Sequence, residues 1–260
     1  MRIGRAKQGD RIFYGVLADN QIAEIVGDIY DEFTITSKNH SLAHVELLAP
    51  IEPKNIIAIG LNYRKHALEN GRDIPRKPVI FIKANTSLVG PDAFIKLPKN
   101  HPNEVDFEAE LAVVIGKTAK DVEEAEALDY VLGYTCSNDI SARDCQMRLD
   151  VQWARGKSFD TFCPIGPWIE TEIDPNNQRI RSRVNGSPMQ DSNTADMIFT
   201  IAYLISYCSK NMTLLPGTVI MTGTPEGVGV ARDPQVFLRN GDVVEVEVEG
   251  IGTLRNPVKL

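Results

Sequence analysis

Apolar and polar positions along the chain follow patterns that are typical of strands. The stretch DVVEVEVEG (residues 242–250) alternates cleanly, as a half-exposed antiparallel strand does. Shorter runs that are apolar nearly throughout predict buried strands, and they lie at residues 56–62 (IIAIGLN), 79–84 (VIFIKA), 111–116 (LAVVIG) and 218–223 (TVIMTG). We therefore expect the main part of the chain to be built on β-sheets.

The first fifty residues differ from this pattern. Residues 2–48 alternate short apolar runs with turn residues, which predicts a small antiparallel β unit. Residues 47–55 (LLAPIEPKN) contain two prolines and predict a connector. The chain is therefore expected to divide into a small N-terminal β domain over residues 1–50 and a main domain over residues 51–260.

Few segments have the pattern of a helix. Residues 121–128 (DVEEAEAL) predict a short acidic helix, and residues 194–209 (TADMIFTIAYLISYCS) are apolar nearly all round, which predicts a mostly buried helix. Strands do not alternate regularly with helices, so a doubly wound fold is not expected. The predicted class is a β-rich α+β fold with mixed sheets in a roll or sandwich.

Composition narrows the possible partners and compartments. With 260 residues, 43% of them hydrophobic, the chain is long enough to bury a full core. A net charge of −7 disfavours nucleic acid and anionic membranes as partners. The four cysteines have neither disulfide nor zinc spacing, and the N-terminus lacks the apolar segment of a signal peptide, so a cytoplasmic protein is expected.

An acidic triplet at residues 105–116 (VDFEAELAVVIG) is the first candidate for chemistry. If residues 105–115 form one strand, Asp106, Glu108 and Glu110 share a face at intervals of roughly 7 Å. Like charges there would repel unless a cation offsets them, and carboxylates alone suit the hard ions Mg²⁺ and Mn²⁺. A solvated acidic face on an exposed strand is the alternative.

Three further segments carry polar residues at points where apolar runs end. Asp139 follows a buried-looking segment and could add a third carboxylate, although Asn138-Asp139 read alone predicts a turn or helix cap. Lys157 stands between Gly156 and Ser158 ahead of an aromatic, proline-rich stretch. Residues 222–229 (TGTPEGVG) resemble an anion cradle of backbone N–H groups, and they lack the ending of a Walker loop.

Several of these motifs, in this order, resemble the fumarylacetoacetate hydrolase family. The resemblance spans residues 56–230, and the first fifty residues resemble the small extra domain of many bacterial and archaeal members. The motifs that carry it are GLNYRKHALE (60–69), VIFIKANTSL (79–88), DFEAELAVVIG (106–116), GYTCSNDISARD (133–144), GKSFDTFCPIGPW (156–168), DMIF (196–199) and LLPGTVIMTGTPEGVG (214–229).

The resemblance implies a metal site. In such proteins the E-x-E pair and the aspartate of the N-D-x-S-A-R-D motif hold one Mg²⁺ or Mn²⁺, which here means Glu108, Glu110 and Asp139. Asp106 is then expected to orient these ligands. The metal would chelate a 2-oxo acid and stabilise a pyruvate enolate, with Lys157 supplying positive charge beside it.

The resemblance also implies a set of substrate contacts. His66 and Glu69, three residues apart on one helix face, match a pair that activates water in relatives that cleave acylpyruvates, although such a pair is otherwise most often an exposed charge pair. Glu226 is expected to be exposed. Predicted contacts to the substrate are Arg143, Gln146, Thr224 as a hydroxyl donor to its carboxylate, and Lys83 and Tyr63.

Three functions remain open at this stage. The first is a metal-dependent hydrolase that cleaves a carbon–carbon bond in an acylpyruvate-like 2,4-dioxo acid. The second is an oxaloacetate decarboxylase, or the isomerase and decarboxylase of the 2-hydroxyhepta-2,4-diene-1,7-dioate type. The third is a non-catalytic metal-binding protein. A homodimer is expected from the resemblance, and the basic residues Arg72, Arg76 and Lys77 suggest either a second substrate carboxylate or a solvated loop.

Overall fold

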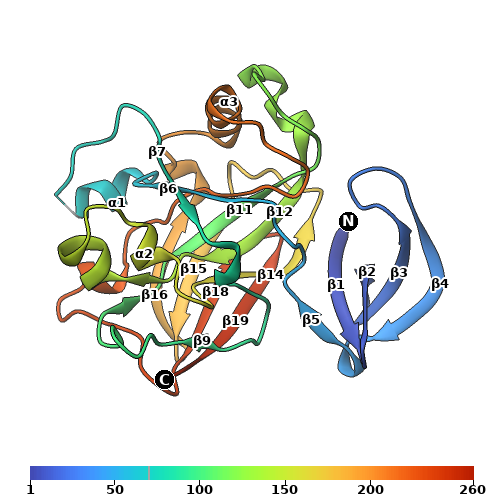
Figure 1. Cartoon of the computed structure of the whole chain (residues 1–260), viewed down its shortest axis with the longest axis horizontal. Helices are drawn as coiled ribbons and strands as arrows, with labels where there is room; N and C mark the ends of the chain where they lie inside the picture. The colour runs from blue at the N-terminus through green and yellow to red at the C-terminus, as the bar shows by residue number, and fades with distance from the viewer. Residues whose placement is uncertain (70) are drawn as a thin grey trace.

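The computed structural model describes residues 1–69 and 71–260, and in them it confirms the predicted β-rich fold with mixed sheets and few helices. Its largest sheet runs in the order β4-β3-β2-β1-β14-β12-β11-β17-β6-β7, with β5 paired to β1 and β8 to β14. A second sheet runs β16-β15-β18-β19-β9, and β10 pairs with β13. Figure 1 shows the strands of the main body gathered on one side and β1 to β4 on the other.

The strands of the large sheet are bounded as follows: β1 Arg2–Gln8, β2 Arg11–Ala18, β3 Gln21–Gly27, β4 Phe33–Ser41, β5 Glu46–Leu48, β6 Ile56–Gly60, β7 Val79–Lys83, β8 Leu88–Val89, β11 Ala109–Ile115, β12 Val131–Asn138, β14 Cys163–Glu170 and β17 Val219–Met221. The other strands are β9 Ile95–Lys96, β10 Val105–Asp106, β13 Ser141–Ala142, β15 Arg179–Val184, β16 Ser187–Asn193, β18 Val243–Val248 and β19 Gly252–Lys259.

The N-terminal strands continue the large sheet of the main body. β1 pairs antiparallel with β2 along its whole length and with β14 at its start, where Arg2 lies opposite Glu170. A small core of Ala6, Phe13, Leu17 and Ile22 lies within this N-terminal unit. The division at residue 50 stays a prediction, because strand pairing crosses from one part to the other.

Strand β11 lies at the centre of the fold, and its period of two explains how the core is divided. All seven of its residues are buried. Leu111, Val113 and Ile115 face one core with β18 and α3, whereas Ala112 and Val114 face a second core with β6 and β14. Both faces of β11 are therefore apolar along its C-terminal half, as the sequence predicted, and its polar residues are confined to the other end.

Helices are short in the described residues: α1 Arg64–Glu69, α2 Ala154–Lys157 and α3 Ile201–Asn211. The prediction of a helix over residues 194–209 was wrong at its start, because α3 begins after Thr200, whose hydroxyl accepts the Tyr203 N–H. Residues 194–196 form a separate 3₁₀ turn. α3 buries one face only, with Tyr203 stacked between Phe199 and Tyr207 on the other.

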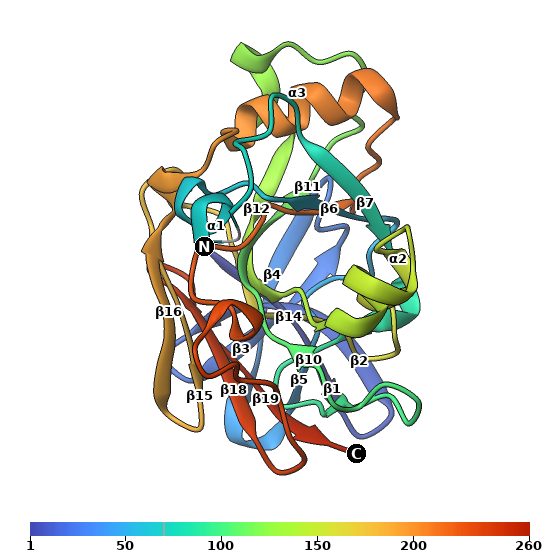
Figure 2. The ribbon, with the colours of Figure 1, turned by 90° about the vertical axis from the view of Figure 1, so that its left-hand side faces the viewer.

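Short 3₁₀ and π-helical segments complete the fold: Leu42–His44, Asn85–Ser87, Glu124–Tyr130, Cys145–Leu149 and Gly229–Ala231. The acidic helix predicted at 121–128 is thus a 3₁₀ helix that starts three residues later. It packs beside α3, which lies across the top of the molecule in Figure 2. No helix in the described residues is both long enough and apolar enough to span a membrane.

Candidate active site

The acidic stretch at residues 105–115 is not one strand. β10 ends at Asp106 and pairs with β13, whereas β11 starts at Ala109 and pairs with β12 and β17. The chain leaves one sheet and enters another at Phe107 and Glu108. Asp106 therefore does not share a face with the two glutamates, which corrects the single-strand prediction.

Three carboxylates converge where β11 begins and β12 ends. One oxygen from each of Glu108, Glu110 and Asp139 lies within 4.8 Å of the others, and all three residues are buried. Antiparallel pairing of Ala109 with Asn138 brings the two segments together. The Asp139 N–H donates to the Glu108 carbonyl (2.9 Å), so the backbone itself sets the spacing of these side chains.

Buried cations balance two of these carboxylates. Lys157 Nζ lies 2.7 Å from Glu108 Oε2 and 2.6 Å from Asp139 Oδ2. Asp139 also binds Lys83, and Arg143 Nη1 lies 2.8 Å from Glu108 Oε1. Burial raises the pKa of Glu108, but Lys157 and Arg143 outweigh burial and lower this pKa to about 2.

Glu110 differs from its two neighbours. In the described part of the chain no lysine or arginine pairs with it, and its Oε2 accepts the N–H of Gly223 (2.9 Å). Burial and the nearby charges of Asp139 and Glu108 raise its pKa well above the usual range. A carboxylate with no balancing cation, facing two others, is the arrangement that a divalent cation with oxygen ligands would complete. The residues present therefore fit the predicted metal.

Asp106 organises the wall beside this cluster. Its carboxylate accepts the N–H groups of Gly229 and Val230 (2.8 and 2.9 Å), and Arg143 Nε donates to it (2.8 Å). A Cβ at Gly229 would lie 2.5 Å from Asp106 Oδ1, so only glycine fits there. Arg143 also binds Glu108, so the side chain of Arg143 links Asp106 to the carboxylate cluster. That Asp106 orients the metal ligands stays a prediction.

The glycine-rich loop at residues 222–230 does bind anions through its backbone, as its sequence suggested, but the anions are carboxylates of the protein. Its N–H groups donate to Glu110 from Gly223, to Glu69 from Gly227 and to Asp106 from Gly229 and Val230. Glu226 in this loop was predicted to be exposed. Its side chain is only 26% exposed and accepts a hydrogen bond from Ser192, so that prediction was wrong.

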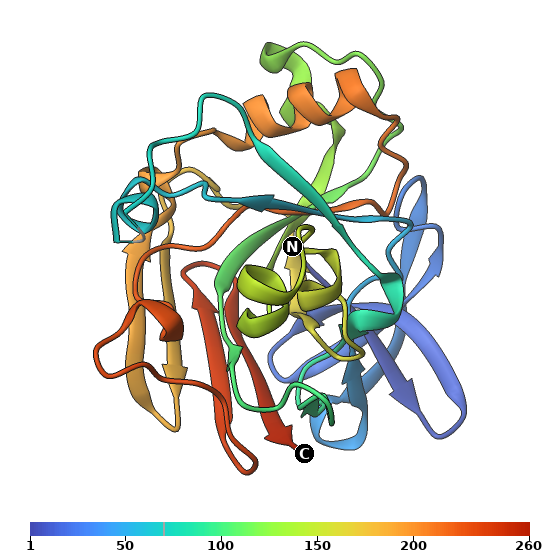
Figure 3. The ribbon, with the colours of Figure 1, turned by 60° about the vertical axis from the view of Figure 1, so that its left-hand side comes forward.

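A cavity of about 270 Å³ opens beside the carboxylates. Eight of the predicted site residues line it: His66, Glu108, Glu110, Asp139, Arg143, Gln146, Lys157 and Thr224. Figure 3 shows the segment that carries Gln146 and Lys157 as two short helices in the middle of the view, between the strands of the two sheets. Residues from segments more than a hundred positions apart therefore meet around one space.

Four predicted residues are not part of this lining. Lys83 is buried and binds Asp139. Asp106 and Glu69 do not line the cavity, but each binds a residue that does: Asp106 binds Arg143, and Glu69 binds His66. Tyr63 is fully buried, its hydroxyl has no hydrogen-bond partner in the described residues, and burial raises its pKa well above the usual value. Contact of Tyr63 or Lys83 with a substrate stays a prediction.

His66 and Glu69 form the expected pair at the end of α1. His66 Nδ1 lies 2.7 Å from Glu69 Oε1, and the other Glu69 oxygen accepts the Gly227 N–H at 2.9 Å. The carboxylate is thus held from two sides and can hold the imidazole ring. In the tautomer with a proton on Nδ1, the lone pair is on Nε2 of a side chain that lines the cavity.

Thr224 has its hydroxyl proton engaged in this structure. Its Oγ1 donates to the Ala109 carbonyl (2.9 Å) and accepts from Gln190 Nε2 (2.8 Å). The predicted donation to a substrate carboxylate would require this proton to leave Ala109. Gln146 lies beside Arg143, whose Nη1 donates to its Oε1 (2.8 Å).

The sequence reasoning missed Trp153 and Asp150, which also line the cavity. Trp153 packs edge-on against Phe81, with ring centroids 5.6 Å apart, and accepts the Lys157 N–H at its carbonyl. One signal was visible: a tryptophan four residues before Lys157 lies one helical turn away from it.

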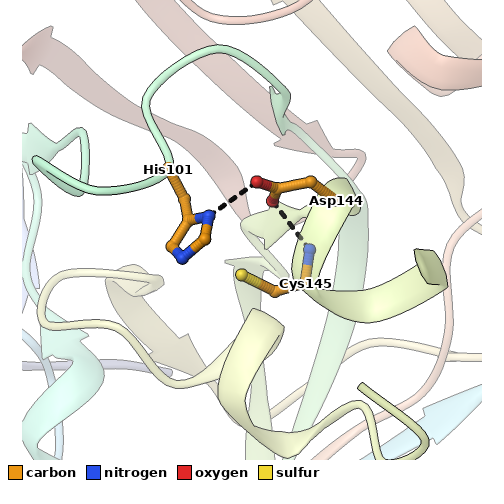
Figure 4. Close-up of side chains that lie close together, drawn as sticks. All are labelled: His101, Asp144 and Cys145. Carbon is orange, nitrogen blue, oxygen red and sulfur yellow. Dashed lines mark hydrogen bonds and ion pairs between the residues drawn. The ribbon is translucent and has the colours of Figure 1, made fainter. Parts of the chain in front are cut away.

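A second group of possible metal ligands lies at the start of the π-helical segment Cys145–Leu149: His101, Asp144 and Cys145 (Figure 4). His101 Nδ1 lies 2.7 Å from Asp144 Oδ2, and His101 Nε2 lies 3.3 Å from Arg155. Both ring nitrogens of His101 thus have protein partners, and burial raises the pKa of the Cys145 thiol to about 11. This group fixes the start of the helical segment and is not suited to a cation.

Comparison with known proteins agrees with this geometry. The family model "Fumarylacetoacetate (FAA) hydrolase C-terminal" matches residues 55–259, and "Rv2993c-like, N-terminal" matches residues 1–50. The chain belongs to the fumarylacetoacetate hydrolase family. The resemblance inferred from the motifs is therefore confirmed.

Individual relatives carry enzyme names. "Oxaloacetate tautomerase fahd2, mitochondrial" of Xenopus laevis is 50% identical over 86% of this chain and 72% of that protein. The structure of 5-carboxymethyl-2-hydroxymuconate delta-isomerase from Mycobacterium smegmatis has a TM-score of 0.91 at 44% identity, covering 100% of this chain and 99% of that one.

A third relative is 2-hydroxyhepta-2,4-diene-1,7-dioate isomerase from Mycobacterium marinum. Its structure has a TM-score of 0.90 at 42% identity and covers 100% of this chain and 98% of that one. These names confirm the prediction of an enzyme, and these three relatives are named as a tautomerase and two isomerases.

Proposed function

We propose that this chain is a Mg²⁺- or Mn²⁺-dependent enzyme that moves a proton between the keto and enol forms of a small 2-oxo acid. The observation that carries the proposal is the buried trio Glu108, Glu110 and Asp139, in which Glu110 has no cationic partner in the described residues. When bound, the divalent ion would polarise the 2-oxo group and the adjacent carboxylate of the substrate, and the trio would hold it.

Lys157 stabilises negative charge in this scheme. Its ammonium group is buried, and although burial lowers its pKa, Asp139 and Glu108 outweigh burial and raise it. Lys157 therefore stays protonated, and it faces the cavity next to the carboxylates. Negative charge that develops on the 2-oxo oxygen of a substrate would be stabilised there.

His66 is the candidate base, because it lines the cavity and Glu69 orients its imidazole ring. The imidazole would take a proton from the carbon next to the 2-oxo group and return it to carbon or oxygen. Keto–enol exchange requires only this proton transfer and charge stabilisation. The names of two relatives, an oxaloacetate tautomerase and a 2-hydroxyhepta-2,4-diene-1,7-dioate isomerase, support the same class of reaction.

Hydrolysis of an acylpyruvate is the second candidate, and the His66–Glu69 pair can serve this reaction as well. The same imidazole could deprotonate a water molecule instead of carbon. Decarboxylation of oxaloacetate needs no water, and it uses the same stabilised enolate. The three reactions share one site and differ in which atom receives or loses the proton.

The test is a product assay with oxaloacetate and acetylpyruvate side by side. Loss of the enol absorbance without loss of oxaloacetate means tautomerisation, release of CO₂ means decarboxylation, and acetate from acetylpyruvate means hydrolysis. Each reaction is run with Mg²⁺, with Mn²⁺ and after EDTA treatment. Metal-independent turnover, or none with either substrate, would contradict the proposal.

A pair of variants shows whether His66 carries the proton. His66→Asn removes the base and should lower turnover by roughly 10²-fold or more. His44→Asn changes an exposed histidine in the N-terminal unit and should leave turnover unchanged. We also propose a homodimer, which light scattering of the purified protein would test.

A further inference from the structure

The charged side chains that line the cavity are nearly all paired. Glu108 and Asp139 bind Lys157, Arg143 binds Glu108 and Asp106, and Asp150 binds Arg155 at 2.5 Å. The exceptions among the described lining residues are one anion and one cation. The anion is Glu110, which the metal proposal already uses, and the cation is Arg72, for which no acidic partner is found among residues 1–69 and 71–260.

Arg72 is held close to the proposed base. Its N–H donates to the Ala67 carbonyl and the Gly71 N–H donates to the Leu68 carbonyl, both at 3.0 Å, with Gly71 in the left-handed region at φ 62°. These two bonds form a Schellman turn that ends the helix of His66 and Glu69. The backbone of Arg72 is thus fixed to α1, and Arg72 is one of the residues that line the cavity.

Burial divides the cavity into a base and a mouth. Glu110, Asp139 and Lys157 are at most 2% exposed and lie at the base. Arg72 is exposed and, with the exposed Met147 and Val151, lies at the mouth. A 2-oxo acid held at the base by its carboxylate and 2-oxo group would extend toward the mouth, where Arg72 lies.

We propose that Arg72 binds a second carboxylate at the far end of the substrate, so that the enzyme selects 2-oxo dicarboxylic acids over monocarboxylic ones. The inference rests on the proposed function for the orientation of the substrate. Guanidinium groups are always charged and bind carboxylates through two parallel hydrogen bonds. The opposing possibility is that Met147 and Val151 receive an apolar tail, and the experiment separates the two.

The first arm measures turnover of oxaloacetate and of acetylpyruvate by wild type, Arg72→Gln and Arg72→Lys. Arg72→Gln should raise KM for the dicarboxylate by about tenfold or more, with kcat and the KM for the monocarboxylate nearly unchanged. Arg72→Lys keeps the charge and should recover part of the loss. Arg76→Gln, in the same exposed loop but outside the cavity lining, is the matched control.

The second arm measures binding without turnover. Calorimetry with the Mn²⁺-loaded protein compares 2-oxoglutarate with 2-oxopentanoate, which has the same chain length and lacks the second carboxylate. Wild type should bind the diacid about tenfold more tightly, and Arg72→Gln should bind both acids equally. Equal binding by wild type, or a preference that survives Arg72→Gln, would overturn the role of Arg72.

The two arms separate this inference from the proposed function. If wild type binds the diacid more tightly through Arg72 but turns over neither substrate, the proposed reaction fails and the role of Arg72 stands. If wild type turns over both substrates and Arg72→Gln affects them equally, the reaction stands and the selection of diacids is wrong. Tighter binding of 2-oxopentanoate would favour the apolar tail and overturn the inference.

Discussion

A single buried carboxylate in the N-terminal unit and a buried trio in the main body have opposite charge balances. In the N-terminal unit, Glu24 on β3 is 4% exposed and contacts Arg11, Lys38 at 2.8 Å and His40 at 2.6 Å. In the main body, three carboxylates share one small space and one of them has no cation in the described residues.

The pKa values follow that difference. The hydrogen bonds from Arg11, and then those from Lys38 and His40, outweigh burial and lower the pKa of Glu24 well below its usual range. Burial and like charges raise the pKa of Glu110. Burial is common to both glutamates, so burial alone does not indicate a functional site. A functional site is indicated instead by an excess of buried negative charge that no lysine or arginine balances.

The largest expected effect comes from neutralising the unbalanced carboxylate. Glu110→Gln should lower metal-dependent turnover by roughly 10²-fold or more, because a ligand and a charge are lost. Without metal the variant should be at least as stable as wild type, since a buried carboxyl group that is costly to ionise has been replaced by a neutral amide. Melting with and without Mn²⁺ checks both statements, with the exposed Glu126→Gln as control. A Tm increase on adding Mn²⁺ as large as that of wild type would contradict the assignment.

Removal of Lys157, the cation that Glu108 and Asp139 share, should lower the stability of the protein. Lys157→Met leaves Glu108 and Asp139 without their shared ammonium group, which should destabilise the protein by about 3–5 kcal/mol as well as remove activity. Urea unfolding of the metal-free protein measures this loss. Lys120→Met, at a half-exposed lysine, should change little. If Lys157→Met is as stable as wild type, the charge balance described here is wrong.

A moderate effect is expected at the balanced carboxylate. Glu24→Gln should lower Tm by roughly 2–4 °C, because Arg11, Lys38 and His40 lose their shared partner, and it should leave turnover unchanged. Scanning calorimetry and the oxaloacetate assay on one preparation give both values. A loss of activity greater than the loss of folded protein would show that the N-terminal unit takes part in the reaction.

The smallest effect is the pH dependence of that same contribution. The pKa of Glu24 is lower in the folded than in the unfolded state, so the folded state is stabilised at pH values above the ordinary glutamate pKa near 4.5. This stabilisation disappears as the pH falls through the folded-state pKa. The Tm difference between wild type and Glu24→Gln should therefore shrink as the pH falls below about 4. A difference that grows in acid would reverse the sign of the assigned shift.

Much of the site was predictable because motifs and local periodicity carry its residues. Glu108, Glu110, Asp139 and Lys157 were each named from the sequence, and the structure brings them to one cavity. The sequence did not predict how segments that are distant along the chain pair with one another. The period of two placed Asp106 with the glutamates, but the chain changes sheets at Phe107, and no local pattern signals which strand a segment will pair with.

By itself the sequence determined that the fold is β-rich and where the buried strands lie, because these depend on neighbours within a few residues. Its motifs also resembled those of a known family, and that resemblance named the candidate site residues. Only the tertiary structure decided how the charges are shared. Lys157 meets Glu108 across 49 positions, the Thr224 hydroxyl bonds to Ala109, and Arg72 reaches the cavity without an acidic partner in the described residues. Electrostatic balance depends on distance through space, and the order of residues along a chain does not contain that distance.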